Sequence, residues 1–377
     1  MKKHLKKIII TILGLIVTTG ICFGIYEYQG RPDADRILSF LKDNPEKVSL
    51  TIQENGKPVV AYYADRSMPL ASVAKIIVAI EYAKQAGAQK IDTEQMVSLK
   101  DINRFYIPGL DGNAQPQWEA YVKEQNKIES GEVSLKEVAK GMIDFSSNAN
   151  MEYLIDILGL DEINKNISEL KLTEHEEIYP FYASLLIPGS LMKEYKELTQ
   201  EEKITKVKSI LKTMPKEEFD LRAIQEHNRL KEDADGSYQS SIQLKQWYDM
   251  EIDKMNSDRL VAATTREYGQ ILAMINQGEY LSKEADSYLR EIMEGPMERE
   301  GNKKLFKHLG FKGGSTNYIL NMAMYSLDKE EQAVEIALFT DGLTTDEFKI
   351  VSKNMNEFLN QILTNKEFRQ KVKGILQ

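Results

Sequence analysis

The stretch Met68-Pro-Leu-Ala-Ser-Val-Ala-Lys-Ile-Ile, residues 68–77, decides the prediction of fold and chemistry for this chain. Its proline and the apolar residues that continue to Ala83 predict a helix that begins near Ser67–Pro69, because proline is favoured in a first helical turn. Ser72 and Lys75 are three residues apart, so they lie on one face of that helix. Free backbone N–H groups at a helix start can support an oxyanion, and a buried neutral lysine can activate a serine hydroxyl. The stretch therefore predicts Ser72 as a nucleophile and Lys75 as its base.

The Ser-x-x-Lys spacing is not specific by itself. Elsewhere in the chain it is explained by solvated helix faces, and it recurs at Ser39, Ser168, Ser190, Ser209 and Ser326. Ser72 differs from these copies because it follows a predicted β-hairpin and opens a strongly apolar helix. That context favours a catalytic serine over one that only occupies a helical turn.

Two further motifs follow, and the order of all three carries a resemblance to a known family. Ser146-Ser147-Asn148 lies between two predicted helices, and Lys312-Gly313-Gly314 precedes Ser315 and Thr316. The order Ser-x-x-Lys, Ser-x-Asn, Lys-x-Gly resembles the penicillin-recognising serine enzymes, meaning class A β-lactamases and low-molecular-weight D,D-peptidases. Residues 68–77 look like the class A active-site helix, and residues 130–148 resemble the approach to the second motif. The resemblance covers about residues 35–375, apart from a predicted helical insertion at about 190–257.

This resemblance implies a role for each catalytic residue. Ser72 would attack the acyl carbon of the substrate, and Lys75 would help to remove the hydroxyl proton. Ser146 would pass that proton toward the leaving nitrogen. A positive charge on Lys312 would lower the pKa of Lys75, which keeps that amine neutral.

The resemblance also implies which residues bind the substrate. Asn148 would hold Lys75 and the substrate amide, and Lys312 would bind the substrate carboxylate. Gly314 and Ser315 complete this group at the third motif. The backbone N–H groups of Ser72 and Ser315 would form the oxyanion hole, which usually makes a large contribution to catalysis.

Two positions depart from the family pattern. Gly313 stands where the family carries Thr or Ser between Lys and Gly, and Ser315 or Thr316 would have to compensate. Upstream of a predicted turn at Leu185–Gly189, residues 178–183 fall where the family's omega loop has Glu-x-x-Leu-Asn, which leaves Tyr179 in place of Glu. That Glu activates the water that cleaves the acyl-enzyme. We therefore expect slow deacylation, unless the nearby Glu176 or Glu177 takes over.

The pattern of elements predicts an α+β fold with an antiparallel five-stranded sheet flanked by the terminal helices, plus an all-α lobe. Strand-type runs occur in two groups, with Asn55-Gly56 as a hairpin signal in the first. The runs are 48–52, 58–63, 306–311, 318–326 and 334–339. Helices are expected at 33–42, 133–143, 149–158, 264–275 and 283–297, with a final helix that Thr345 caps, and a long loop with some helix at 100–128.

The N-terminus predicts a membrane anchor. Four lysines precede an apolar run from Ile8 to about Tyr26, which is long enough to cross a bilayer with the basic end in the cytoplasm. We expect residues 1–27 to be a cytoplasmic tail and transmembrane helix, and residues 28–377 to be an extracellular hydrolase domain on a single-pass cell membrane protein. A cleaved signal peptide is the alternative, and it gives the same location. Ile21 before Cys22 disfavours lipidation.

Composition restricts the partners. The net charge of -9, with no basic stretch beyond the first seven residues, argues against a nucleic-acid partner. The four histidines lack ligand spacing, so we expect no metal and no cofactor. The expected partner is a small-molecule or peptidoglycan-peptide substrate. A serine hydrolase that acts on β-lactam or cell-wall peptide-like substrates is the first hypothesis, and a non-catalytic sensor of β-lactams or wall fragments is the second.

Overall fold

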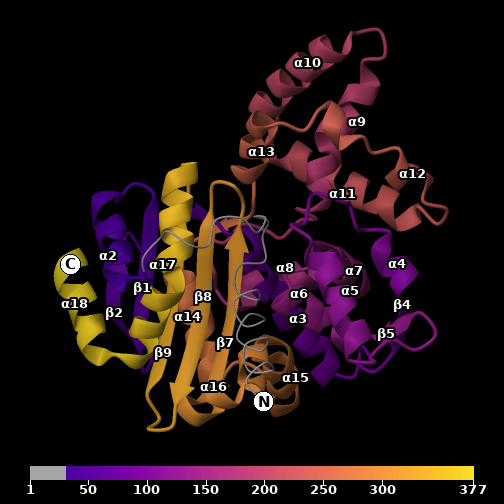
Figure 1. Cartoon of the computed structure of the whole chain (residues 1–377). Helices are drawn as coiled ribbons and strands as arrows, with labels where there is room; N and C mark the ends of the chain where they lie inside the picture. Colours follow the sequence, from indigo (N-terminus) through magenta and orange to yellow (C-terminus); the bar gives the residue numbers. More distant parts are fainter. Residues whose placement is uncertain (1–30) are drawn as a thin grey trace.

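The computed structural model describes residues 31–377, and its two groups of strands meet in one antiparallel sheet of order β2-β1-β9-β8-β7 (Figure 1). The strands are β1 (Val48–Glu54), β2 (Lys57–Tyr62), β7 (Phe306–Ser315), β8 (Leu320–Asp328) and β9 (Ala333–Thr340). The hairpin predicted at Asn55-Gly56 is confirmed, with both residues at positive φ of 49° and 70°. The central strand β9 is buried along its whole length, so both faces of the sheet need a cover.

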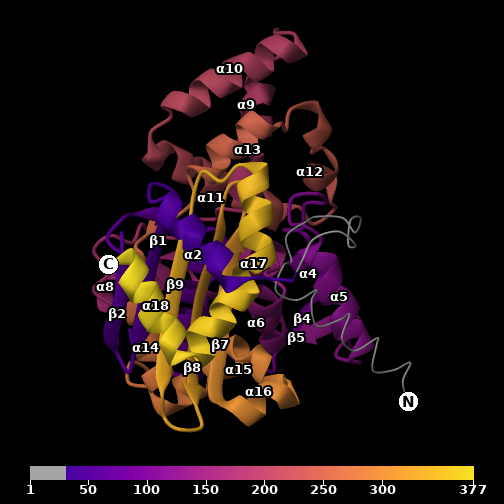
Figure 2. The same ribbon diagram turned by 60° about the vertical axis from the view of Figure 1, so that its left-hand side comes forward.

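The terminal helices cover one face of the sheet, as predicted. Their apolar residues form a single core with the sheet, and they are α2 (Ala34–Asp43), α17 (Thr345–Thr364) and α18 (Lys366–Leu376). Helix α14 (Thr265–Gln277) packs on the opposite face, against β1, β8 and β9 (Figure 2). The predicted cap of the final helix is wrong by one residue. Thr344 is the cap and shares a capping box with Glu347, and Asn365 then divides the expected single helix in two.

A second lobe is formed by helices, as predicted, around the buried helix α3 (Lys75–Gly87). Its other helices are α4 (Leu99–Asn103), α5 (Ala114–Glu124), α6 (Leu135–Asp144), α7 (Asn148–Leu158), α8 (Leu160–Glu169) and α15 (Lys283–Met293), with α16 (Glu300–Leu305) beside β7. A small pair of strands, β4 (Met96–Ser98) and β5 (Glu132–Ser134), borders it. The start of the helix expected at 133–143 is therefore a strand, and the expected helix at 283–297 ends at Met293.

The helix predicted to begin at Ser67–Pro69 begins later. Met68–Pro69 is the short strand β3, which pairs with β6 (Ala262–Ala263). Ala71 has a positive φ of 48°, which a continuous helix does not allow. A 3₁₀ helix at Ala71–Ala74 then leads into α3. Pairing with a segment almost two hundred positions away along the chain, rather than the local proline signal, decides this start.

The segment predicted as a helical insertion is helical, and it projects beyond both lobes (Figures 1 and 2). It contains α9 (Ile187–Glu194), α10 (Gln200–Thr213), α11 (Lys216–Glu232), α12 (Ser237–Ser240) and α13 (Met250–Ser257). The turn predicted at Leu185–Gly189 is wrong, because α9 starts at Ile187 with Pro188 in its first turn, where proline is tolerated. Gly189 instead makes room for Trp247, whose ring lies 2.9 Å from where a Cβ would stand.

The predicted membrane anchor at residues 1–27 lies outside the described residues. Among the helices of residues 31–377, none combines the length and the apolar content that a bilayer-spanning segment needs.

Candidate active site

Ser72 lies in the 3₁₀ helix at Ala71–Ala74, and contacts from the sheet fix its position. Asn321 of β8 donates from Nδ2 to the carbonyl oxygens of Pro69 and Leu70, at 2.7 and 3.2 Å. Gly314 of β7 packs so closely that a Cβ there would lie 2.5 Å from Leu70 O and 2.8 Å from Ser72 N. The third motif therefore holds the backbone around the serine in place. The close contact also explains why glycine occupies position 314, because a larger residue would not fit there.

Lys75 is fully buried behind the serine, one helical turn away. Its Nζ donates to Ser146 O at 2.6 Å and to Asn148 Oδ1 at 2.7 Å, and lies 3.4 Å from Ser146 Oγ. Burial is the main cause that holds the pKa of Lys75 well below its ordinary value, because it disfavours a charged amine. The positive charge of Lys312 is the next cause, because it disfavours a second cation nearby. The lysine that the sequence predicted as a base is therefore stabilised in its neutral form.

Lys312 of β7 joins the second and third motifs. Its Nζ donates to Ser146 Oγ and to Gly313 O, both at 2.9 Å. Burial lowers the pKa of Lys312 to about 7, although the charge of Asp144 opposes that shift. Ser146 has a positive φ of 62°, uncommon for a serine, and its hydroxyl lies between the two lysine amines.

The predicted site residues meet at one cavity of about 580 Å³ between the lobes. Ser72, Ser146, Asn148 and Ser315 line it directly, while Lys75 and Lys312 lie behind Ser146. Helix α13 of the insertion forms another wall through Met250, Asp253, Asn256 and Ser257, next to Tyr248. The insertion therefore reaches the mouth of the cleft, as expected. Thr316, considered as a substitute for the missing hydroxyl of Gly313, shares a 2.8 Å hydrogen bond with Ser257.

Residues 174–189 bring no carboxylate to the cavity. They line it only with Phe181, Tyr182 and Leu185. Glu176 accepts from Ala262 N at 3.1 Å, and Glu177 is exposed, so neither takes the place of a carboxylate in the cleft. The residue at the family's Glu position, Tyr179, is buried and donates to Arg259 O at 2.8 Å.

Asp111 is a cleft residue that the sequence did not reveal. It lies in the segment expected to be mostly loop, and its carboxylate accepts from the backbone N–H groups of Asn113 and Gln115 at 3.0 and 2.8 Å. The Gln115 side chain in turn accepts from Ser147 Oγ at 2.6 Å, which links this loop to the second motif. Burial raises the pKa of Asp111, and its negative charge raises that of Lys75. A single aspartate in a polar segment gives no local signal of such a contact.

Glu152 is a second buried carboxylate that the sequence did not single out. It accepts from the backbone N–H groups of Tyr182 and Ala183 at 3.1 and 3.0 Å. Its other oxygen lies 2.5 Å from Nδ1 of His227 on α11. Glu152 thus joins α7, the segment at the cleft wall and the insertion, although these parts are far apart in sequence.

Comparison with known proteins agrees with this architecture. Residues 33–309 match the family model described as the β-lactamase enzyme family. The TLA-3 extended-spectrum β-lactamase superposes with a TM-score of 0.53 at 14% identity, over 87% of this chain and 96% of that protein. A β-lactamase from Sphaerobacter thermophilus superposes with a TM-score of 0.52 at 15% identity, over 88% of this chain and 97% of that protein. A β-lactamase from Chitinophaga pinensis superposes with a TM-score of 0.50 at 13% identity, over 87% of this chain and 98% of that protein. These similarities establish the fold, and no curated protein sequence matches the chain.

Proposed function

Because the chain belongs to the β-lactamase enzyme family, we propose that it is an extracytoplasmic serine hydrolase that forms an acyl-enzyme at Ser72. Its substrates would be β-lactams or cell-wall peptide-like amides. The observation that carries the proposal is the position of Ser146 Oγ, 3.4 Å from the amine of Lys75 and 2.9 Å from that of Lys312. Three motifs from distant parts of the chain thus form one proton network beside the cavity that Ser72 lines.

The hydrogen bonds of Lys75 explain how it can act as a base. A neutral amine has two N–H donors and one lone pair. Its two short contacts, at 2.6 Å to Ser146 O and 2.7 Å to Asn148 Oδ1, are to carbonyl oxygens that only accept. The lone pair is left for a hydroxyl proton, and both Ser72 and Ser146 carry one. Burial, and next the charge of Lys312, lower the pKa of Lys75 and so favour the form of the amine that has this lone pair.

Acylation then follows from these positions. Ser72 Oγ bonds to the acyl carbon while its proton moves to Lys75 Nζ, and the oxyanion is held by the backbone N–H groups of Ser72 and Ser315. The C–N bond of the substrate breaks as Ser146 delivers its hydroxyl proton to the leaving nitrogen and takes a proton from Lys75 in its place, which restores the neutral amine. Lys312 pairs with the substrate carboxylate. This carboxylate replaces Ser146 Oγ and Gly313 O as the hydrogen-bond acceptor of Lys312, and unlike them it is charged.

Deacylation is the weaker step in this proposal. Water that attacks an ester needs a base, and residues 174–189 line the cavity only with aromatic and apolar side chains. The two carboxylates that line it elsewhere already accept hydrogen bonds, Asp111 from the N–H groups of Asn113 and Gln115 and Asp253 from Tyr248 and Asn317. An acyl-enzyme at Ser72 would therefore persist. The same observation favours a second function, a β-lactam or wall-fragment sensor, in which the long-lived adduct is the signal.

A time course with a fluorescent penicillin tests the proposal. The native chain should be labelled, the label should last for hours, and Ser72→Ala should take up none. A native chain that stays unlabelled at high penicillin concentration contradicts an acyl-enzyme with β-lactams. Rapid loss of the label, with turnover of a chromogenic cephalosporin, shows instead that deacylation is efficient.

The proposed location is the outer face of the cell membrane. The basic, apolar N-terminal sequence supports it, since four lysines precede the apolar run from Ile8 to about Tyr26. On cell fractionation the chain should sediment with membranes and resist salt extraction. Recovery in the cytosolic fraction would contradict both the anchor and the external domain.

A further inference from the structure

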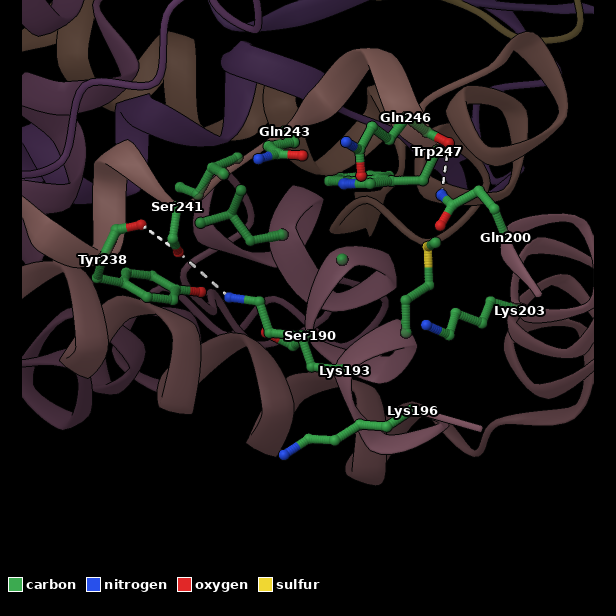
Figure 3. Close-up of a pocket in the computed structure, with 14 residues that line it drawn as sticks. Ser190, Lys193, Lys196, Gln200, Lys203, Tyr238, Ser241, Gln243, Gln246 and Trp247 are labelled. Carbon is green, nitrogen blue, oxygen red and sulfur yellow. Dashed lines mark hydrogen bonds between the residues drawn. The ribbon is translucent and has the colours of Figure 1, made fainter. Parts of the chain in front are cut away.

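A second cavity, here called the insertion pocket, lies within the projecting helical segment (Figure 3). Its volume is about 370 Å³, which suits a small ligand. It is formed by α9, the start of α10 and the segment from Tyr238 to Trp247. Figure 3 shows Lys193 directed toward Tyr238 and Ser241, with Lys203 on the other side and Gln243 and Gln246 along the edge.

The charges around the insertion pocket favour an anion. Lys193, Lys196 and Lys203 line it, and none of its lining residues is an aspartate or glutamate. Within residues 31–377 none of these three lysines forms an ion pair, although the chain as a whole carries a net charge of -9. Other lysines of the same segment are paired, as Lys208 is with Asp249 at 2.6 Å. Three cations without a carboxylate partner around one cavity attract a negatively charged ligand, although Lys193 also lies over the ring of Tyr238, 5.2 Å from its centroid.

The other lining groups suit a sugar. Gln200, Gln243 and Gln246 offer amide donors and acceptors that match hydroxyl groups, and Ser190 and Ser241 add two hydroxyls. The rings of Tyr238 and Trp247 provide apolar faces. Several of these groups already have partners. Gln200 Nε2 donates to Gln246 O at 2.9 Å, Lys193 Nζ to Ser241 Oγ at 3.3 Å and Ser241 Oγ to Tyr238 O at 2.7 Å. Arg229 Nη1 donates to Ser190 Oγ at 2.9 Å, and the Tyr238 hydroxyl donates to Glu226. Within residues 31–377 the side chains of Lys196, Lys203, Gln243 and Gln246 form no hydrogen bond, so these four are available to a ligand with several hydroxyls.

The insertion pocket and the active-site cleft are adjacent. Trp247 lines the pocket and Tyr248, the next residue, lines the cleft, with their rings in edge contact at 5.8 Å between centroids. In the same way Leu186 faces the pocket and Leu185 the cleft. A ligand in the pocket would contact the chain neighbours of two residues that form the cleft wall.

We propose that the insertion pocket binds an acidic saccharide, a sugar that carries a carboxylate or a phosphate group. The anionic group lies between Lys193, Lys196 and Lys203. The sugar hydroxyls bond to the glutamine amides, and the ring packs against Tyr238 and Trp247. This binding is independent of acylation at Ser72.

Tryptophan fluorescence of the full chain tests this proposal. The chain has two tryptophans, Trp247 in the pocket and Trp118 buried in the other lobe, so a ligand in the pocket changes the signal of one. Glucuronate, glucose 6-phosphate, glucose and inorganic phosphate are titrated and checked by calorimetry. At least one acidic sugar should bind tenfold or more tightly than glucose and phosphate. Equal affinity for glucose overturns the charge argument, and equal affinity for phosphate overturns the sugar argument. Absence of saturation by both acidic sugars overturns the proposal.

Charge-neutral variants locate the site. Lys196→Gln and Lys203→Gln should each weaken binding of the acidic sugar fivefold or more, because each removes one of three cations. Lys245→Gln is the matched control, since Lys245 is an exposed lysine of the same segment that does not line the pocket. An unchanged affinity in both pocket variants, or an equal loss in the control, refutes the assignment. Circular dichroism checks that the variants are folded, and binding to Ser72→Ala should equal that of the native chain.

Discussion

Replacement of Gly314 by alanine is the sharpest test of how the sheet positions the nucleophile. An added Cβ would lie 2.5 Å from Leu70 O, 2.8 Å from Ser72 N and 2.9 Å from Val73 N. All three atoms belong to the backbone, so no side chain can rotate away. Since unstrained contacts are about 3.5 Å or longer, strand β7 and the 3₁₀ helix must move apart by about 1 Å.

Replacement of the neighbouring Gly313 by alanine is the matched control for the loss of stability expected in Gly314→Ala. A Cβ at Gly313 would lie 3.5 Å from the flexible Cε of Met322, which is an ordinary contact. Alanine reduces the entropy of the unfolded chain equally in both variants, by about 0.4–1 kcal/mol, so this effect cancels in their difference. Overpacking at Gly314 should therefore make Gly314→Ala less stable than Gly313→Ala by about 1–3 kcal/mol. A 1 Å shift of the nucleophile should also slow acylation by about 100-fold.

Two assays on the full chain check these values. Urea denaturation gives the free energy of unfolding for both variants, and the rate of labelling by a fluorescent penicillin gives the acylation step. Gly313→Ala should retain the native labelling rate to within a few-fold. If Gly314→Ala matches Gly313→Ala in stability and labelling, the close contact does not position Ser72 and the reasoning is wrong.

Two further predictions concern the buried charges. The labelling rate should rise with pH as Lys75 loses its proton and fall above about pH 7 as Lys312, whose pKa is about 7, loses the charge that binds the substrate carboxylate. Lys312→Arg should remove the fall and Asp111→Asn should move the rise to lower pH, because the charge of Asp111 raises the pKa of Lys75. A flat profile would contradict both assignments. Glu152→Ala should lower the unfolding free energy by about 1–3 kcal/mol for each buried donor left without an acceptor, with a smaller loss for Glu152→Gln, as urea denaturation would show. A loss below about 1 kcal/mol would mean that water replaces the carboxylate.

Local sequence patterns predicted much of the fold. Runs of strand-type residues marked the strands, and Asn55-Gly56 marked their first turn, because a tight hairpin needs two residues that tolerate positive φ. The same patterns failed where a distant segment competed. Met68–Pro69 has the local signal of a helix start but pairs with Ala262–Ala263. Leu185–Gly189 has the composition of a turn but packs as helix under Trp247.

The sequence by itself determined the chemistry expected at Ser72, because a serine and a lysine three residues apart must share a helix face, and the order of three motifs completed the set. Tertiary structure alone decided what surrounds that serine. It placed Asp111 at the cleft, kept Glu176 and Glu177 out of it, and set the insertion pocket against the cleft wall. The physical reason is the distance along the sequence over which each property is determined. Spacing along a helix is a property of neighbouring residues, whereas the pKa of Lys75 and the lining of the cleft depend on packing between segments that the sequence separates.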